Sequence, residues 1–268
     1  MSKAMAQRID PRVIPFAVDS DPPVRGYLHY PAVSADDSPP TTDRRQPTTD
    51  LRQAVVLSHG AGSNCEAPLL VAVATAFAGT GFTVLRCDLP YRQKRPHGPP
   101  LGSAAEDQRG LRNAVAAVRQ LSRDRPFRRV YLGGHSYGGR QATMLAADDA
   151  ALVDGLLLLS YPLHPPKKPE QLRTAHLSKL RTPAMFVHSS RDPFGSIEEM
   201  ESALTLIPAA TILMPVEGAG HDLSFKPSRP SRPSRPTAPP EEEGRQVEAD
   251  DLPERVVTAF CQWRASLD

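Results

Sequence analysis

The sequence lacks the long apolar runs and the excess of charge that mark several classes of protein. It has no apolar stretch of the roughly 18 residues that a membrane-spanning helix needs. The opening segment MSKAMAQRIDPRVIPF has no apolar core of a secretory signal. The formal net charge is +2, which is too small to favour nucleic acid or an anionic membrane surface. We therefore expect neither nucleic acid nor a membrane as a partner.

Cysteine is also scarce: Cys65, Cys87 and Cys261 are far apart in the chain. They form no C-x-x-C pair and no spacing typical of a metal site. Reduced thiols and a cytoplasmic location are therefore expected, and neither a metal nor an organic cofactor is predicted. The sequence carries no signal for an oligomeric state.

Proline, in contrast, is abundant, with 29 residues, and most of them cluster in stretches that separate apolar segments. We expect an N-terminal tail over residues 1–11 and a single domain over residues 12–268, with disordered inserts at 33–50 and 226–250. The second insert repeats Ser-Arg-Pro three times over residues 228–236. Its composition leaves open a lid, a docking arm or an inert loop.

Between these stretches, apolar runs alternate with amphipathic ones. The apolar runs predict strands over residues 12–18, 25–30, 53–59, 82–88, 128–134, 153–161, 182–189 and 210–216. Helical spacing and capping residues predict helices over residues 68–79, 103–123, 139–147, 196–206 and 253–266. This order indicates an α/β fold in which helices cover both faces of a mostly parallel sheet. In such sheets, functional residues gather at the carboxyl ends of the strands.

The motif G-x-S-x-G lies where a predicted strand passes into a helix, at Gly134-His135-Ser136-Tyr137-Gly138. A tight turn of this kind holds its serine in a strained backbone conformation, and the flanking glycines leave room for neighbouring segments. The hydroxyl is then exposed at the top of the sheet. Ser136 is the predicted nucleophile.

A serine needs a histidine base, and in this fold the order along the chain is serine, acid, histidine. His221, in the glycine-rich segment EGAGHDL after the last predicted strand, suits the base best. His188 ends an apolar run and is read as a strand residue. His164 ranks below His221 because no suitable acid lies between Ser136 and it.

The acid is predicted to be Asp192, in the segment HSSRDPFGS after the strand at residues 182–189. Pro193 and Gly195 mark a turn that aims its carboxylate across the top of the sheet. Asp222 adjoins the base and faces elsewhere in most loop geometries, and Asp154 precedes its strand. Asp192 is left as the third member of the triad.

An oxyanion hole requires backbone N–H donors beside the nucleophile. We expect one from Tyr137, the residue after Ser136, and one from the segment SHGAGSN, where Ala61 is preferred over Gly60. In the segment CDLPYRQKRPHGPP, the basic residues Arg92, Lys94 and Arg95 are read as a solvated charge run, with attraction of an anionic substrate as the alternative. Further residues are candidates to line the substrate pocket: His59, Gly60, Gly62, Tyr91 and His164.

Together these segments resemble the α/β-hydrolase superfamily, in its dienelactone-hydrolase-like branch. LSHGAGSN is similar to the oxyanion loop, GGHSYGGR to the nucleophile turn, SSRDPFG to the acid loop and EGAGHDL to the histidine loop. The stretch LSYPLHPPKKPEQLRTAHLSKLRTPAMFV resembles the testis-expressed and NSL-complex hydrolase-like subgroup. The resemblance implies an α/β-hydrolase fold with no large cap domain. Dienelactone hydrolases use a cysteine nucleophile, whereas here Ser136 stands at that position, so dienelactone is not favoured.

The function expected from these residues is acyl transfer. A serine hydrolase would cleave small-molecule esters or thioesters through an acyl-enzyme. The alternative is a catalytically weak hydrolase-fold protein that serves as an interaction module. The two hypotheses differ in whether Ser136 reacts with serine-directed reagents.

Overall fold

A computed structural model describes residues 12–31, 52–122, 125–225 and 251–267. The predicted N-terminal tail and the inserts at 33–50 and 226–250 lie outside these described residues, so their expected disorder stays a prediction. None of the helices that the structure describes is long and apolar enough to cross a membrane.

The described residues form one eight-stranded sheet, in the order β1-β2-β4-β3-β5-β6-β7-β8. The six strands from β4 to β8 in this order run parallel, whereas β2 pairs antiparallel with both β1 and β4. The strands are β1 (Val13–Val18), β2 (Val24–His29), β3 (Gln53–Ser58), β4 (Phe82–Cys87), β5 (Arg129–His135), β6 (Gly155–Leu159), β7 (Ala184–Ser189) and β8 (Thr211–Val216). All eight strands expected from the apolar runs are present, and their ends differ from the predicted ones by at most two residues.

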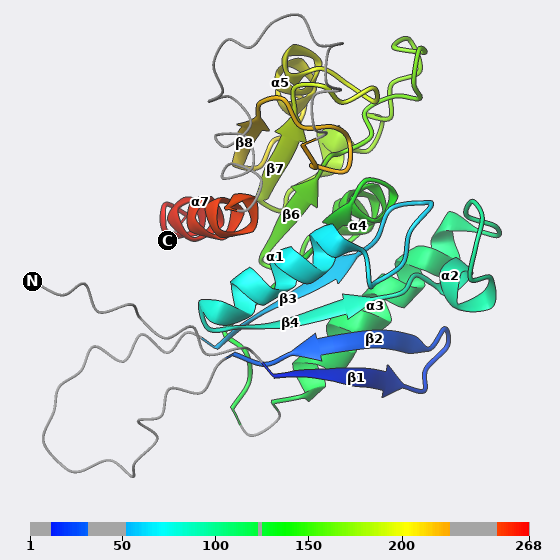
Figure 1. Cartoon of the computed structure of the whole chain (residues 1–268), viewed down its shortest axis with the longest axis vertical. Coiled ribbons are helices and arrows are strands. Elements are labelled where there is room, and N and C mark those ends of the chain that lie inside the picture. The colour runs from blue at the N-terminus through cyan, green and yellow to red at the C-terminus, as the bar shows by residue number, and fades with distance from the viewer. Residues whose placement is uncertain (1–11, 32–51, 123–124, 226–250, 268) are drawn as a thin grey trace, which may run out of the picture.

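Helices cover both faces of this sheet (Figure 1). One face packs against α1 (Pro68–Gly79) and α7 (Leu252–Ala265), around the aromatic cluster of Phe77, Tyr131 and Phe260. The other face packs against α3 (Ala104–Gln120), α4 (Tyr137–Asp148) and α5 (Ile197–Leu204). Strands β3, β4, β6 and β7 are buried along their whole length, because both of their faces meet apolar helices. The predicted fold class is confirmed.

Two short elements were not expected from the sequence. The segment after β4, read as a charged loop, folds into the five-residue helix α2 (Pro90–Lys94). Proline at its first position presets the backbone angle of a helix. A single 3₁₀ turn, η1 (Leu177–Lys179), follows β6. Of the two, α2 bears on the site, because Tyr91 and Arg92 belong to it.

Candidate active site

Ser136 lies at the tight turn between β5 and α4. Its backbone angles are φ 50° and ψ −113°, a conformation that is strained for any residue with a side chain. A Cβ atom on Gly134 would lie 2.4 Å from the carbonyl oxygen of Ser58, and one on Gly138 2.4 Å from the Ser58 hydroxyl. The two glycines of the motif are therefore required by the close approach of the β3 terminus.

His221 bridges Ser136 and Asp192 through its two ring nitrogens. Its Nε2 atom lies 2.8 Å from the Ser136 hydroxyl, and its Nδ1 atom lies 2.7 and 2.9 Å from the two carboxylate oxygens of Asp192. Because Asp192 can only accept there, Nδ1 carries the proton, and Nε2 is free to accept the hydroxyl proton. The structure thus brings together the three residues that were predicted as a triad.

Asp192 is enclosed within its own loop, and its side chain has no exposed area. One carboxylate oxygen accepts the backbone N–H of Phe194 at 2.9 Å, and the Phe194 ring packs on His221 with ring centres 4.2 Å apart. His188, read as a strand residue, lies in β7 and donates to the carbonyl of Gly195 at 2.8 Å. These contacts fix the carboxylate and the plane of the imidazole that it holds.

His135, the residue before the nucleophile, supports the base in a way that the sequence did not reveal. Its Nε2 atom lies 2.8 Å from the carbonyl oxygen of His221 and donates to it. Burial lowers the pKa of His135 to about 4, so the ring is neutral near pH 7. A neutral ring that donates through Nε2 ties the histidine loop to the turn that holds Ser136.

The predicted oxyanion loop, residues 59–63, lies against this same turn. A Cβ atom on Gly60 would lie 2.8 Å from His135 Nδ1 and 3.5 Å from Ser136 Cβ. The N–H of Gly138 donates to the carbonyl of His59 at 3.1 Å. Only a glycine at position 60 lets the loop come this close.

Tyr91 and Arg92, from α2, bind the carbonyl groups of the oxyanion loop. The Tyr91 hydroxyl lies 3.2 Å from the carbonyl oxygen of Gly60 and 2.9 Å from that of Ala61. The Arg92 guanidinium donates to the carbonyls of Ala61 at 2.9 Å and of Ser63 at 2.7 Å. Because C=O and N–H point oppositely in a trans peptide, the N–H of Ala61 points away from Tyr91.

The expectation that Arg92 belongs to a solvated charge run is wrong. Only 4% of Arg92 is exposed, and its remaining donors bind the carbonyls of Arg95 and Gly98. Asp107, on α3, was also missed: it accepts the Tyr137 hydroxyl at 2.7 Å and the N–H of Tyr91 at 3.3 Å. Burial raises the pKa of Asp107. No local pattern marks either residue, because their partners come from distant segments.

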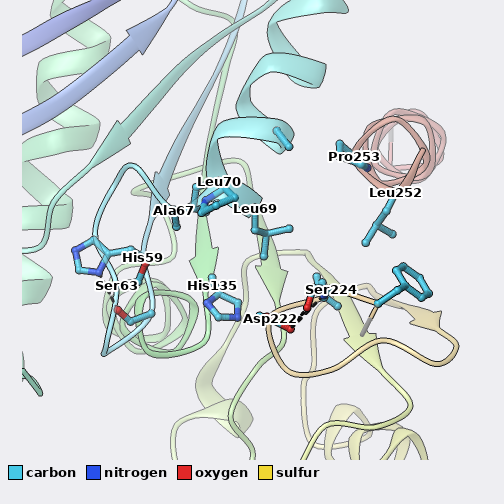
Figure 2. A pocket seen from close by; sticks show the side chains of 15 residues that line it. His59, Ser63, Ala67, Leu69, Leu70, His135, Asp222, Ser224, Leu252 and Pro253 are labelled. Carbon is cyan, nitrogen blue, oxygen red and sulfur yellow. Dashed lines mark hydrogen bonds between the residues drawn. The ribbon is translucent and has the colours of Figure 1, made fainter. Parts of the chain in front are cut away.

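A cavity of about 580 Å³ opens beside the turn, between the oxyanion loop, α1, the histidine loop and the start of α7 (Figure 2). Of the candidate pocket residues, His59 and Gly60 line it, whereas Gly62, Tyr91 and His164 do not. His164 instead lies by the acid loop, 3.3 Å from Glu199. The residues that line the cavity are His59, Gly60, Ser63, Ala67, Pro68, Leu69, Leu70, Ala72, His135, Asp222, Leu223, Ser224, Phe225, Leu252 and Pro253.

The two alternative acids bind elsewhere. Asp222 accepts the backbone N–H and the hydroxyl of Ser224, at 3.2 and 2.7 Å. Asp154 accepts the N–H of Val130 at 2.8 Å, before β6 begins. Within the described part of the chain, no three histidine, cysteine or acidic side chains gather in a way that would hold a metal ion.

The sequence matches a known family, described as "Alpha/beta hydrolase domain", over residues 51–236. Among solved structures, a dienelactone hydrolase from Anabaena variabilis shares 18% identity at a TM-score of 0.62, over 93% of this chain and 98% of that one. Est1E from Butyrivibrio proteoclasticus shares 15% identity at a TM-score of 0.61, over 94% and 99%. An α/β serine hydrolase without a lid, from Xanthomonas campestris, shares 16% identity at a TM-score of 0.57, over 92% and 94%. At these identities the likeness is one of fold.

Proposed function

Since this chain belongs to the α/β-hydrolase family, we propose that it is a serine hydrolase that cleaves small esters or thioesters through an acyl-enzyme. The observation that carries the proposal is the hydrogen-bonded series from Asp192 through His221 to the Ser136 hydroxyl. A hydroxyl on a strained turn, paired with an oriented imidazole, is the arrangement that activated serines share.

In the proposed first step, His221 Nε2 takes the hydroxyl proton while Ser136 Oγ attacks the carbonyl carbon of the substrate. The tetrahedral intermediate collapses, its bond to the alcohol or thiol breaks, and the leaving group takes the proton from His221. Asp192 keeps the imidazole in the tautomer that this transfer needs and stabilises the imidazolium that forms. The acyl group is now an ester of Ser136.

Water completes the cycle in the second step. His221 takes a proton from the attacking water, and the new tetrahedral intermediate collapses to release the carboxylic acid and restore the Ser136 hydroxyl. In both steps the negatively charged oxygen of the tetrahedral intermediate is proposed to accept hydrogen bonds from the backbone N–H groups of Tyr137 and Ala61. Tyr91 supports this role because its hydroxyl lies 3.2 Å from the carbonyl oxygen of Gly60, which shares a peptide plane with the N–H of Ala61. Arg92 holds the next peptide through the carbonyl of Ala61.

Several finer assignments belong to the same proposal. The motif resemblance leads us to propose membership of the testis-expressed and NSL-complex hydrolase-like subgroup. The order of elements along the chain leads us to propose a single domain over residues 12–268, and the few, widely spaced cysteines lead us to propose action in the cytoplasm. A hydrolase-fold protein that acts only as an interaction module is not favoured by the family match or by the esterase and hydrolase neighbours.

The proposal is tested by the hydrolysis of p-nitrophenyl acetate and of an S-acetyl thioester. Wild-type protein is expected to turn over at least one of them, with a burst of p-nitrophenol equal to the enzyme concentration if deacylation is slower than acylation. Ser136→Ala is expected to abolish both turnover and burst. Turnover by Ser136→Ala at the wild-type rate would overturn the proposal.

A further inference from the structure

The cavity beside Ser136 lies on the face of the sheet that α1 and α7 cover. Its apolar wall comes from the first two turns of α1, from Phe225 and from Leu252 at the start of α7. Figure 2 shows Leu69 and Leu70 above His135, with Leu252 on the far side. A volume near 580 Å³ is in the range of sites that enclose small ligands.

The cavity comes close to the nucleophile at Gly60 and His135, although Ser136 and His221 are not among the residues that line it. Both residues line it, and both adjoin Ser136, since a Cβ atom on Gly60 would lie 3.5 Å from Ser136 Cβ. Gly60 also directly precedes Ala61, the proposed oxyanion donor. A substrate whose carbonyl oxygen met that donor would have the cavity within reach of its acyl chain.

Most of the polar side chains that line the cavity already have a hydrogen-bond partner within the protein. His59 accepts the N–H of Leu89 at Nε2 and donates from Nδ1 to the carbonyl of Gly60. Asp222 is held by Ser224, and His135 donates to His221. A ligand that enters thus meets apolar side chains and few groups that seek a hydrogen-bond partner.

The charged groups that line the cavity also disfavour a substrate that carries a second carboxylate. Asp222 contributes a carboxylate, and none of the described residues that line the cavity is a lysine or an arginine. A carboxylate at the far end of a substrate would lose its hydration and meet a like charge there. The cavity therefore disfavours substrates that carry a second acid group.

We propose that this cavity binds the acyl chain of the substrate, and that the chain is apolar and uncharged. The inference rests on the proposed function, because an acyl chain is positioned here only if Ser136 is the nucleophile. It narrows the substrate class to esters or thioesters whose acyl chain is apolar and uncharged.

The first test measures kcat/KM for p-nitrophenyl acetate, butyrate, hexanoate and octanoate. Burial of one methylene group is worth about 0.8 kcal/mol, so kcat/KM is expected to rise about fourfold for each carbon that the cavity encloses. The mono-p-nitrophenyl ester of adipic acid is expected to react at least tenfold more slowly than the hexanoate. A second series, from ethyl to octyl acetate, lengthens the alcohol and is expected to show a much weaker trend.

Substitutions on α1 test whether the dependence of kcat/KM on acyl-chain length arises from this cavity. Ala72 lines it and Thr75 is exposed on the same helix. Ala72→Phe is expected to lower the ratio of octanoate to acetate activity at least tenfold, whereas Thr75→Phe keeps the wild-type ratio. Leu69→Lys is expected to raise the ratio of adipate to hexanoate activity at least fivefold, with Thr75→Lys as its control.

The outcomes separate the inference from the proposed function. Hydrolysis of acetate with no rise along the acyl series, or with a rise only along the alcohol series, overturns the inference and leaves the serine hydrolase standing. Failure of the folded wild-type protein to hydrolyse any ester or thioester overturns the proposed function itself. If Ala72→Phe does not fold, the Leu69→Lys ratio decides.

Discussion

Two loops flank Ser136, and they are held in different ways. The oxyanion loop, residues 59–63, has internal bonds to the carbonyl of Gly60 from the N–H of Ser63 and from His59 Nδ1. It is bound mainly from outside: Tyr91 and Arg92 hold three of its carbonyl groups. The histidine loop, residues 217–224, is held largely from within. The N–H of Gly220 donates to Ser224, and that of Leu223 donates to Gly220.

The histidine loop has two outside supports in addition. His135 donates to the carbonyl of His221, and the N–H of Gly218 donates to the hydroxyl of Ser190 at 2.9 Å. The oxyanion loop, by contrast, is held by a buried cation, Arg92, whose hydrogen bonds go to backbone carbonyls.

The difference fits what each loop is proposed to do. Donors that stabilise a transition state lower the barrier only if they are already oriented, so the peptide planes of the oxyanion loop have to be fixed in advance. The imidazole is oriented instead by its own carboxylate, so its loop needs less external support. Breaking each support in turn tests this view.

The largest effect is expected on the histidine side, from Asp192→Asn. An amide cannot hold His221 in the tautomer that accepts the Ser136 proton, so kcat is expected to fall about 10³- to 10⁴-fold. Steady-state hydrolysis of p-nitrophenyl acetate measures the loss. Glu201→Gln, at an exposed carboxylate on α5, is the control and should retain wild-type turnover.

On the oxyanion side, Arg92→Met is expected to lower kcat about 10- to 100-fold, with little change in KM. The loop then loses donors to the carbonyls of Ala61 and Ser63. The peptide that follows the Ala61 N–H is no longer fixed, so this donor is less well oriented where negative charge develops. Kinetics on the same ester checks this, and Arg95→Met, an exposed arginine in the same segment, is the matched control. Equal losses in both variants would contradict a role specific to Arg92.

His135→Phe should have a smaller effect, about tenfold in kcat/KM, because it removes one hydrogen bond from the histidine loop and keeps the aromatic shape. His135→Gln, which retains a donor, is expected to recover part of the loss. Kinetics at pH 7 separates the two variants. If His135→Phe matches the wild type, the support that His135 gives to the loop is not needed for turnover.

The smallest effect is one of stability and lies away from both loops, at His29 on β2. Its Nε2 atom accepts the Arg86 side chain at 2.7 Å, and burial, aided by that cation, lowers the pKa of His29 to about 4. The unfolded chain, with a histidine pKa near 6.5, binds the proton first as the pH falls. The stabilisation is therefore complete above pH 6.5 and is lost as the pH falls from about 6.5 toward 4.

Urea unfolding at pH 7 and pH 4.5 tests this. His29→Gln is expected to weaken the loss of unfolding free energy on acidification by on the order of 1–2 kcal/mol. An unchanged pH dependence in His29→Gln would mean that this histidine already binds a proton in the folded state.

Local requirements made much of the fold predictable. Strands β3, β4, β6 and β7 are buried on both faces, which requires a continuous apolar run in each of them. Such a run can be recognised in the sequence of the strand alone. The motif around Ser136 is visible because its residues are consecutive, although the contacts that require Gly134 and Gly138 come from Ser58 at the end of β3. The order of Asp192 and His221 along the chain completed the triad hypothesis.

The supports of the site were not predictable in this way. Arg92 looks like a surface residue in the sequence, and its burial depends on carbonyl groups about thirty residues earlier. Asp107 and His135 likewise act on partners from other elements. Such residues become visible only when the fold brings distant segments together.

The most direct test of the serine hydrolase proposal is covalent labelling with a fluorophosphonate probe, read by intact mass. A single adduct is expected on the wild-type protein, none on Ser136→Ala, and one that forms much more slowly on His221→Ala. No adduct on well-folded wild-type protein, or an adduct that persists in Ser136→Ala, would contradict an activated Ser136.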